Sequence, residues 1–167
     1  MTKITSPNKE VIQNIYDVGR DWVVEQRGPG SKVTKYEYQT DSGDPSHYWT
    51  TIKEGGASSK FDFYDDEDKT VSVDAQGRRT ETVYSRCCGK PLKIVSPDGS
   101  VTKYKYDDRG NVTRIVDSKG RKVRYEYHPK FSKVTKVTTP NGSISYDYNT
   151  KAQLTAGKGP DGTRVDL

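Results

Sequence analysis

Residues 99–128 read GSVTKYKYDDRGNVTRIVDSKGRKVRYEYH and contain one pattern twice. In each copy a glycine precedes a short stretch that ends in two tyrosines one residue apart, and a turn-like segment follows. Glycines in the same place recur every 20 to 22 residues, at positions 56, 77, 99, 120, 142 and 162. Self-similarity at a fixed period is typical of repeat proteins, so we predict an array with a period of about 21 residues.

Turn signals divide each repeat into two strands. One turn has the form of DDRGN at 107–111, and the other is SPDG at 96–99, DSKG at 117–120, TPNG at 139–142 or GPDG at 159–162. Proline presets the first central position of a turn, and glycine accepts the left-handed position at little steric cost. The turn glycines are Gly99, Gly110, Gly120, Gly142 and Gly162. The sequence therefore predicts an all-β fold, a ribbon or solenoid of antiparallel hairpins. Residues 11–22 fit a further strand and turn.

Pairs of aromatic residues end the first strand of most repeats. They are Tyr36 and Tyr38, Phe61 and Phe63, Tyr104 and Tyr106, Tyr125 and Tyr127, and Tyr146 and Tyr148. Residues i and i+2 of a strand share a face, so each pair lies opposite its charged neighbours. We expect stacked repeats to form one aromatic face, which gives a continuous core, and one charged face.

The composition fits a folded β-protein that is poor in ordinary core residues. Of 167 residues, 30% are hydrophobic and 31% are charged, and Tyr is the main apolar supply with 12 copies. Disordered chains are poor in aromatic and β-branched residues, whereas this chain is rich in Tyr, Val and Thr. We expect a single array over 1–167. Residues 1–74 hold divergent repeats with an insertion near 39–50, and residues 75–167 hold regular ones.

The charge pattern excludes several classes of partner. The net charge of +5 arises from positive residues interleaved with acidic ones, so we predict no nucleic-acid partner. No apolar stretch approaches the roughly 18 residues that a membrane helix needs, so we predict no membrane insertion. The N-terminus lacks the apolar region of a signal peptide.

The repeat resembles the RHS or YD repeat, whose loose consensus is G-x-x-x-x-Y-x-Y-D-x-x-G-N-L. The best matches are Gly99, Tyr104, Tyr106, Asp107, Gly110 and Asn111. The resemblance implies a large bacterial surface or secreted protein, related to teneurins and to the shells of insecticidal toxin complexes. Such repeats wind as a β-sheet spiral into a shell. The self-cleaving segment that ends those shells has no counterpart here, so only the repeat architecture carries over.

Two local features are candidate sites. His47, Tyr48 and Trp49 lie in the insertion and form either a ligand-binding loop, because exposed aromatic rings stack on sugars, or a cluster that packs back on the sheet. Cys87 and Cys88 form either a disulfide, within or between chains, or an ordinary turn where other repeats have DDRG. Adjacent cysteines do not suit the usual zinc spacing.

The remaining polar motifs predict no chemistry. Asp65, Asp66, Glu67 and Asp68 fit neither of the common calcium loops and indicate a solvated turn. His128 follows a tyrosine pair where a turn aspartate is expected. No nucleophile, base and orienting group can be assembled, so we expect no enzyme, no metal and no cofactor.

Taken together, these features predict a structural protein, extracellular or at the cell surface. Repeat arrays need capped ends, because open strand edges are templates for another chain. We expect the open ends to join further copies of the chain, or a longer YD-repeat chain, into a fibre, tube or shell. The alternatives are an adhesin module that binds cell-surface glycans, and a fragment of a toxin-enclosing shell.

Overall fold

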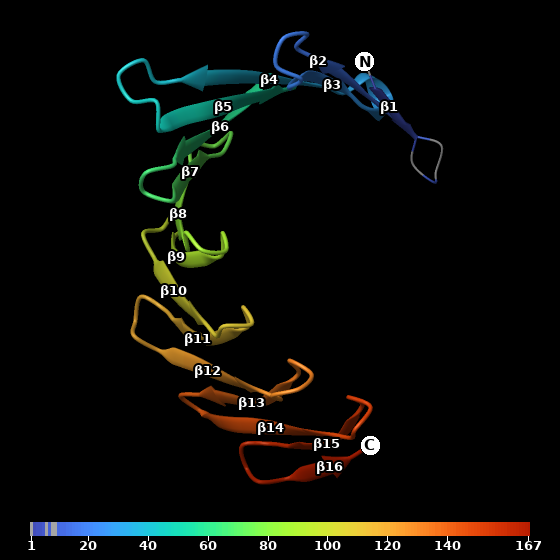
Figure 1. The fold of residues 1–167 in the computed structure, drawn as a ribbon, viewed down its shortest axis with the longest axis vertical. Helices are drawn as coiled ribbons and strands as arrows, with labels where there is room; N and C mark the ends of the chain where they lie inside the picture. Colours follow the sequence, from blue (N-terminus) through green and yellow to red (C-terminus); the bar gives the residue numbers. More distant parts are fainter. Residues whose placement is uncertain (1, 6, 8–9) are drawn as a thin grey trace. The chain divides into compact units, whose positions relative to one another are not determined.

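The computed structural model describes residues 2–5, 7 and 10–167, which form two compact units, 1–87 and 88–167 (Figure 1). The strands of the first unit are β1 (Thr2–Thr5), β2 (Val11–Tyr16), β3 (Val23–Arg27), β4 (Val33–Thr40), β5 (His47–Glu54), β6 (Ala57–Tyr64), β7 (Lys69–Val73) and β8 (Arg79–Tyr84). Those of the second unit are β9 (Pro91–Val95), β10 (Val101–Tyr106), β11 (Val112–Val116), β12 (Lys122–Tyr127), β13 (Val134–Thr139), β14 (Gly142–Tyr148), β15 (Leu154–Lys158) and β16 (Arg164–Asp166).

Within each unit the strands follow one another in chain order, each antiparallel to the next. The prediction of an all-β hairpin ribbon is confirmed. One 3-10 turn, η1 (Pro29–Ser31), is the single helical element of the described residues. The described part of the chain holds no helix long and apolar enough to cross a membrane.

A five-residue turn recurs at both ends of the hairpins. At Asp107 the carboxylate accepts the backbone N–H groups of Arg109 at 3.1 Å and Asn111 at 2.8 Å, and the N–H of Gly110 donates to the Asp107 carbonyl. Gly110 has φ +80°, in the left-handed region where glycine avoids strain. The same backbone pattern recurs in the turns that begin at Asp74, Ser96, Asp117, Asn149 and Gly159. The five predicted turn glycines all have positive φ.

A β-bulge sits beside the second tyrosine of the regular repeats. Tyr106 pairs with Val112 while Lys105 pairs with Arg114, so Thr113 is the extra residue. The register shifts in the same way at Tyr127 and Tyr148, and at Tyr16 in the first unit. Bulges bend the strand and increase its local twist.

The second tyrosine of a pair also links neighbouring strands through its hydroxyl. Tyr106 donates to the carbonyl of Pro91, Tyr127 to that of Val112, and Tyr148 to that of Val134, at 2.7 to 2.8 Å. Tyr38 donates in the same way to Val23 in the first unit. Each acceptor is the first residue of the strand before the tyrosine's own. We call this set of bonds the tyrosine ladder.

Neither unit encloses a continuous core, contrary to expectation. The buried apolar residues of the described chain are Val71 and Ala156, and the ladder tyrosines are half-buried. The expected division into one aromatic and one charged face holds in β10 and β12, where tyrosines alternate with exposed charged residues. It fails in β5, because Tyr48 and Trp49 are adjacent in the strand and therefore lie on opposite faces.

Candidate functional site

His47, Tyr48 and Trp49 lie on a strand, not in the expected loop. The inserted residues lengthen β4, β5 and β6 to eight residues each, and the connection between β4 and β5 is confined to residues 41–46. His47 is therefore the first residue of β5, opposite Tyr64 in β6, and Trp49 lies opposite Asp62. Whether these residues bind a ligand stays a prediction.

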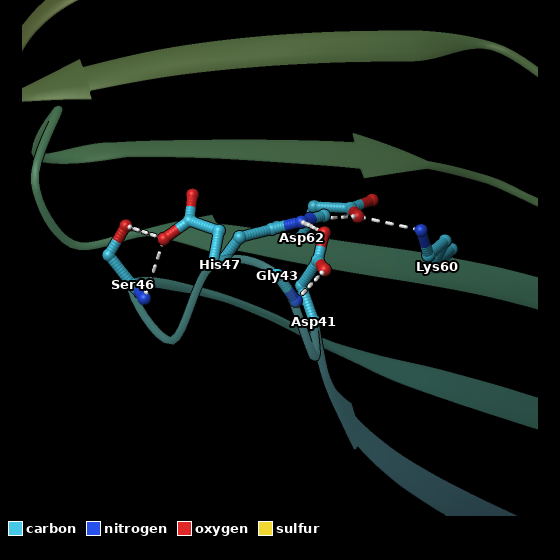
Figure 2. Close-up of polar contacts among 7 residues, drawn as sticks. Asp41, Gly43, Ser46, His47, Lys60 and Asp62 are labelled. Atoms are coloured by element: carbon cyan, nitrogen blue, oxygen red, sulfur yellow. Dashed lines mark hydrogen bonds and ion pairs between the residues drawn. The ribbon is translucent and has the colours of Figure 1, made fainter.

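Both ring nitrogens of His47 face carboxylates (Figure 2). Nδ1 lies 3.2 Å from Oδ2 of Asp41, and Nε2 lies 3.0 Å from Oδ1 of Asp62. Lys60 donates to the same Asp62 oxygen at 2.6 Å. Asp62 is only 6% exposed, so its charge needs these two cationic partners. Asp41 is held in turn by the backbone N–H of Gly43.

This setting favours the imidazolium form of His47. The hydrogen bond to Asp62 is the main cause that raises the pKa of His47 above its ordinary value of 6.5, and the bond to Asp41 adds to it. The pKa of Asp41 is lowered, chiefly by the hydrogen bond from the Gly43 backbone and then by His47. Because each ring nitrogen already has a partner, His47 has no lone pair directed at a substrate or a metal. Its role is an ionic tie between β5, β6 and the loop at 41–46.

Aromatic rings and ammonium groups surround this tie. The His47 ring stacks on Tyr64, with centroids 4.3 Å apart and planes 4° apart. Lys60 Nζ lies 4.5 Å from the Trp49 ring centroid, and Lys69 Nζ lies 4.2 Å from that of Tyr64. Cation–π contacts of this kind stabilise by about 0.5–1 kcal/mol at exposed sites. The rings of His47 and Trp49 therefore pack within the sheet, against side chains of β6.

The first unit also carries a groove of about 760 Å³, the strongest candidate for a binding site. It is lined by Trp22, Tyr38, Tyr48 and Phe63, together with Arg20 and Thr50 and five further residues. Trp22 is 45% exposed and lies 4.8 Å from the Tyr38 ring, and Tyr48 stacks on Phe63 at 5.0 Å. Arg20 lies over the Trp22 ring at 5.4 Å. Exposed aromatic planes beside a cation and hydroxyl groups suit a sugar or another flat, partly polar ligand.

Sequence reasoning identified part of this surface. Tyr48 and Trp49, which both line the groove, were predicted as part of a ligand loop. Tyr38 and Phe63 were predicted as structural aromatic residues, and Arg20 and Trp22 belonged to neither set. The isolated tryptophan after the turn at residues 17–20 was the available signal. Asp41 and Asp62, the partners of His47, gave no signal. The contact of Asp62 depends on the pairing of β5 with β6, and that of Asp41 depends on the course of the connection at 41–46.

The other singled-out residues occupy turns. Cys87 and Cys88 are both exposed and lie in the turn at residues 86–88, and no disulfide joins them. A disulfide formed under oxidising conditions stays a prediction. In the turn at 65–68 Asp68 pairs with Arg86, and Asp65 accepts the hydroxyl of Tyr48. His128 takes the turn position of an aspartate and accepts the N–H of Lys130. Among the described residues no group of three His, Cys, Asp or Glu side chains could hold a metal.

Comparison with known proteins identifies the repeat. Residues 89–122 and 106–144 match the family model described as RHS Repeat. No curated protein matches the chain.

Several solved structures match parts of their chains to this structure. A TcdB2-TccC3-Cdc42 complex is 16% identical over 90% of this chain, with a TM-score of 0.45. The Photorhabdus luminescens Tc holotoxin pore is 14% identical over 92% of this chain, with a TM-score of 0.43. In both cases the chain spans about 7% of the length of the matched protein.

Proposed function

The chain belongs to the RHS-repeat family, and on that premise we propose that it is a structural segment of a larger assembly. In this proposal it is a β-sheet building block whose edge strands pair with further copies of the chain or with a longer RHS-repeat chain. The product is a fibre, a tube or a shell.

The strand order is the observation that supports this proposal most directly. Within each unit every described strand pairs only with its neighbours in chain order, so one side of β1 and one side of β16 have no partner among the described residues. Ile4 in β1 is 54% exposed and Val165 in β16 is 58% exposed. Natural sheets usually protect an exposed edge with lysine, proline or a bulge, because an open edge pairs readily with another strand.

Edge substitutions test the proposal. Ile4→Lys and Val165→Lys place a charge on β1 and β16, and each should reduce the concentration-dependent growth of light scattering and of filaments in negative-stain images. Val18→Lys is the matched control, because Val18 is fully exposed in a turn and lies on no edge. A wild-type chain that stays monomeric at high concentration, alone and with a longer RHS-repeat chain, would contradict the proposal.

We further propose that the chain is not an enzyme and that it acts outside the cell or at the cell surface. The occupied ring nitrogens of His47 support the first inference. The family resemblance supports the second. Protease treatment of intact source cells tests the location, since a surface protein is digested and an internal one is protected.

The groove in the first unit supports a second candidate function, the binding of glycans. A titration with neutral oligosaccharides should quench tryptophan fluorescence in the wild type. Trp22→Ala should abolish the binding, whereas Leu92→Ala, which removes an exposed apolar side chain of the second unit, should leave it unchanged. An unchanged affinity in Trp22→Ala would reject the groove as the site.

A further inference from the structure

The two units carry opposite net charge, although the whole sequence alternates basic and acidic residues. Residues 1–87 contain 12 Lys and Arg against 15 Asp and Glu, whereas residues 88–167 contain 16 against 8. The positive charge of the chain is therefore concentrated in the second unit. Part of it gathers on one face of the sheet formed by β9 to β12.

Cross-strand pairing brings like charges directly opposite one another on this face. Lys105 in β10 pairs with Arg114 in β11, and Arg114 pairs with Arg124 in β12. A second row crosses the same strands. From β9 to β12 it runs through Lys93, Lys103, Val116 and Lys122. We call Lys103, Lys105, Arg114, Lys122 and Arg124 the basic face. Neighbouring strands lie about 4.8 Å apart, so a row of three cations spans about 10 Å.

No acidic partner neutralises the basic face. Within the part of the chain that the structure describes, none of its five side chains forms an ion pair or donates a side-chain hydrogen bond. Glu126, the one acid that β9 to β12 place on this side, lies 3.8 Å from Lys136. The Arg114 Nε–H is enclosed and lacks an acceptor among the described residues. Rotation of Arg114 onto a bound oxyanion would supply one.

In the first unit Lys35 also lies opposite Lys53, but there acidic side chains are close enough to pair with the cations. Lys53 bonds Glu37 at 2.6 Å across β5 and β4, and Arg79 bonds Glu81 at 3.0 Å within β8. Like charges directly opposite one another destabilise a sheet. The basic face therefore opposes stability, and an external anion is the partner that would offset the repulsion.

The surroundings of the basic face narrow the choice of anion. The aromatic residues of β10 and β12, Tyr104, Tyr106, Tyr125 and Tyr127, lie on the opposite side of the sheet, so no ring is present for the bases of a single-stranded nucleic acid to stack on. An extended acidic peptide repeats its carboxylates on one side about every 6.7 Å, so it would match only the two cations of a single strand, such as Lys103 and Lys105. It would not follow the row of three cations that crosses the strands about 4.8 Å apart. A sugar chain carries anions along both of its edges and can cover both rows.

We propose that the basic face binds a linear anionic polysaccharide, whose sulfate or carboxylate groups lie over the two rows of cations. This site lies in the second unit and is independent of the structural role and of the groove in the first unit. Its affinity should fall with salt, because exposed charges are screened within about 10 Å at about 0.1 M salt.

Titration of the full chain with a heparin fragment tests this proposal. The variant Lys105→Gln/Arg114→Gln/Arg124→Gln should bind about ten-fold more weakly, since each exposed ion pair changes an equilibrium by a few-fold. The matched control, Lys130→Gln/Lys133→Gln/Lys151→Gln, removes three exposed lysines from the connections between strands of the same unit and should stay within about two-fold of the wild type. Equal weakening in both variants would mean attraction by net charge alone and would overturn the site.

A second variant separates binding from folding. Lys105→Glu places a carboxylate opposite Arg114, so its thermal stability should rise or stay unchanged while the affinity for heparin falls. Unfolding of this variant would contradict the repulsion on which the site is argued. Tighter binding of a duplex or single-stranded oligonucleotide than of heparin, with the same sensitivity to the triple variant, would overturn the polysaccharide assignment. Self-association through the basic face without heparin binding would overturn it as well.

Discussion

His47 is the residue whose charge is most closely tied to the fold. Two carboxylates hold it and raise its pKa, so the folded chain binds a proton more tightly than the unfolded chain does. The stabilisation from protonated His47 is then complete below its ordinary pKa of 6.5 and is lost as the pH rises through the raised value.

The free energy of unfolding should therefore decrease as the pH rises from about 6 through the raised pKa of His47. Urea unfolding across this range checks it, with amide exchange in β5 and β6 as a local readout. His47→Gln should flatten the slope, whereas His128→Gln, in a turn of the other unit, should retain it. A wild-type profile that rises over the same range would show that another group dominates.

Ala152 is an exception among the turns. It occupies the position that glycine holds in the other turns, with φ +59°. The left-handed conformation costs a non-glycine residue about 1–2 kcal/mol. Replacement by glycine removes this cost but lowers stability by about 0.4–1 kcal/mol, because glycine has more conformational freedom in the unfolded chain.

Ala152→Gly should therefore stabilise the fold by about 0.5–1 kcal/mol, measured by chemical unfolding. Gly120→Ala is the opposite experiment. Gly120 has φ +76° and open space around its Cα, so an added methyl group tests the backbone alone and should destabilise. A shift of stability in the same direction in both variants would show that the left-handed backbone conformation does not decide the outcome.

At the scale of the elements, the tyrosine ladder joins β4, β10, β12 and β14 each to the strand before it. Tyr127→Phe removes the hydroxyl that donates to the Val112 carbonyl at 2.8 Å and should cost about 1 kcal/mol. Tyr125→Phe is the control in the same strand, because no described group bonds the Tyr125 hydroxyl, and it should change stability by less than about 0.5 kcal/mol. Equal effects would show that ring packing, not the hydrogen bond, is responsible.

The sequence predicted the hairpins well because their determinants are local. Glycine and aspartate at fixed offsets form the turns, and alternation places Tyr104 and Tyr106 on one side. The bulge beside Tyr106 was missed, because an extra residue in β11 changes the pairing without changing the composition. That shift decides which cation faces Lys105, so the basic face was also missed. The contact of His47 with Asp62 was missed because it requires the register of β5 against β6.

At the scale of the whole molecule, the distribution of charge predicts opposite responses to salt in the two units. An increase from about 0.01 M to about 1 M salt shortens the screening length from about 30 Å to about 3 Å. Amide protection should rise in β10 to β12, where like charges repel, and fall or stay unchanged in β5 and β6, where charges are paired. Hydrogen exchange measured by mass spectrometry compares them in one sample, and a uniform response would contradict the prediction.

The tyrosine ladder has a consequence for how such a chain changes in evolution. Tyr106 and Tyr127 occupy equivalent positions 21 residues apart, and each bonds only to the strand before it and pairs with the strand after it. Loss of residues 107–127 by unequal crossing-over would place Tyr106 directly before His128, in the position of the lost Tyr127. Tyr106 would then lie opposite Val134, which pairs with Tyr127 in the present chain. The bond from Tyr106 to Pro91 would remain and its strand pairing would pass from Val112 to Val134, so the ladder would tolerate the gain or loss of whole repeats.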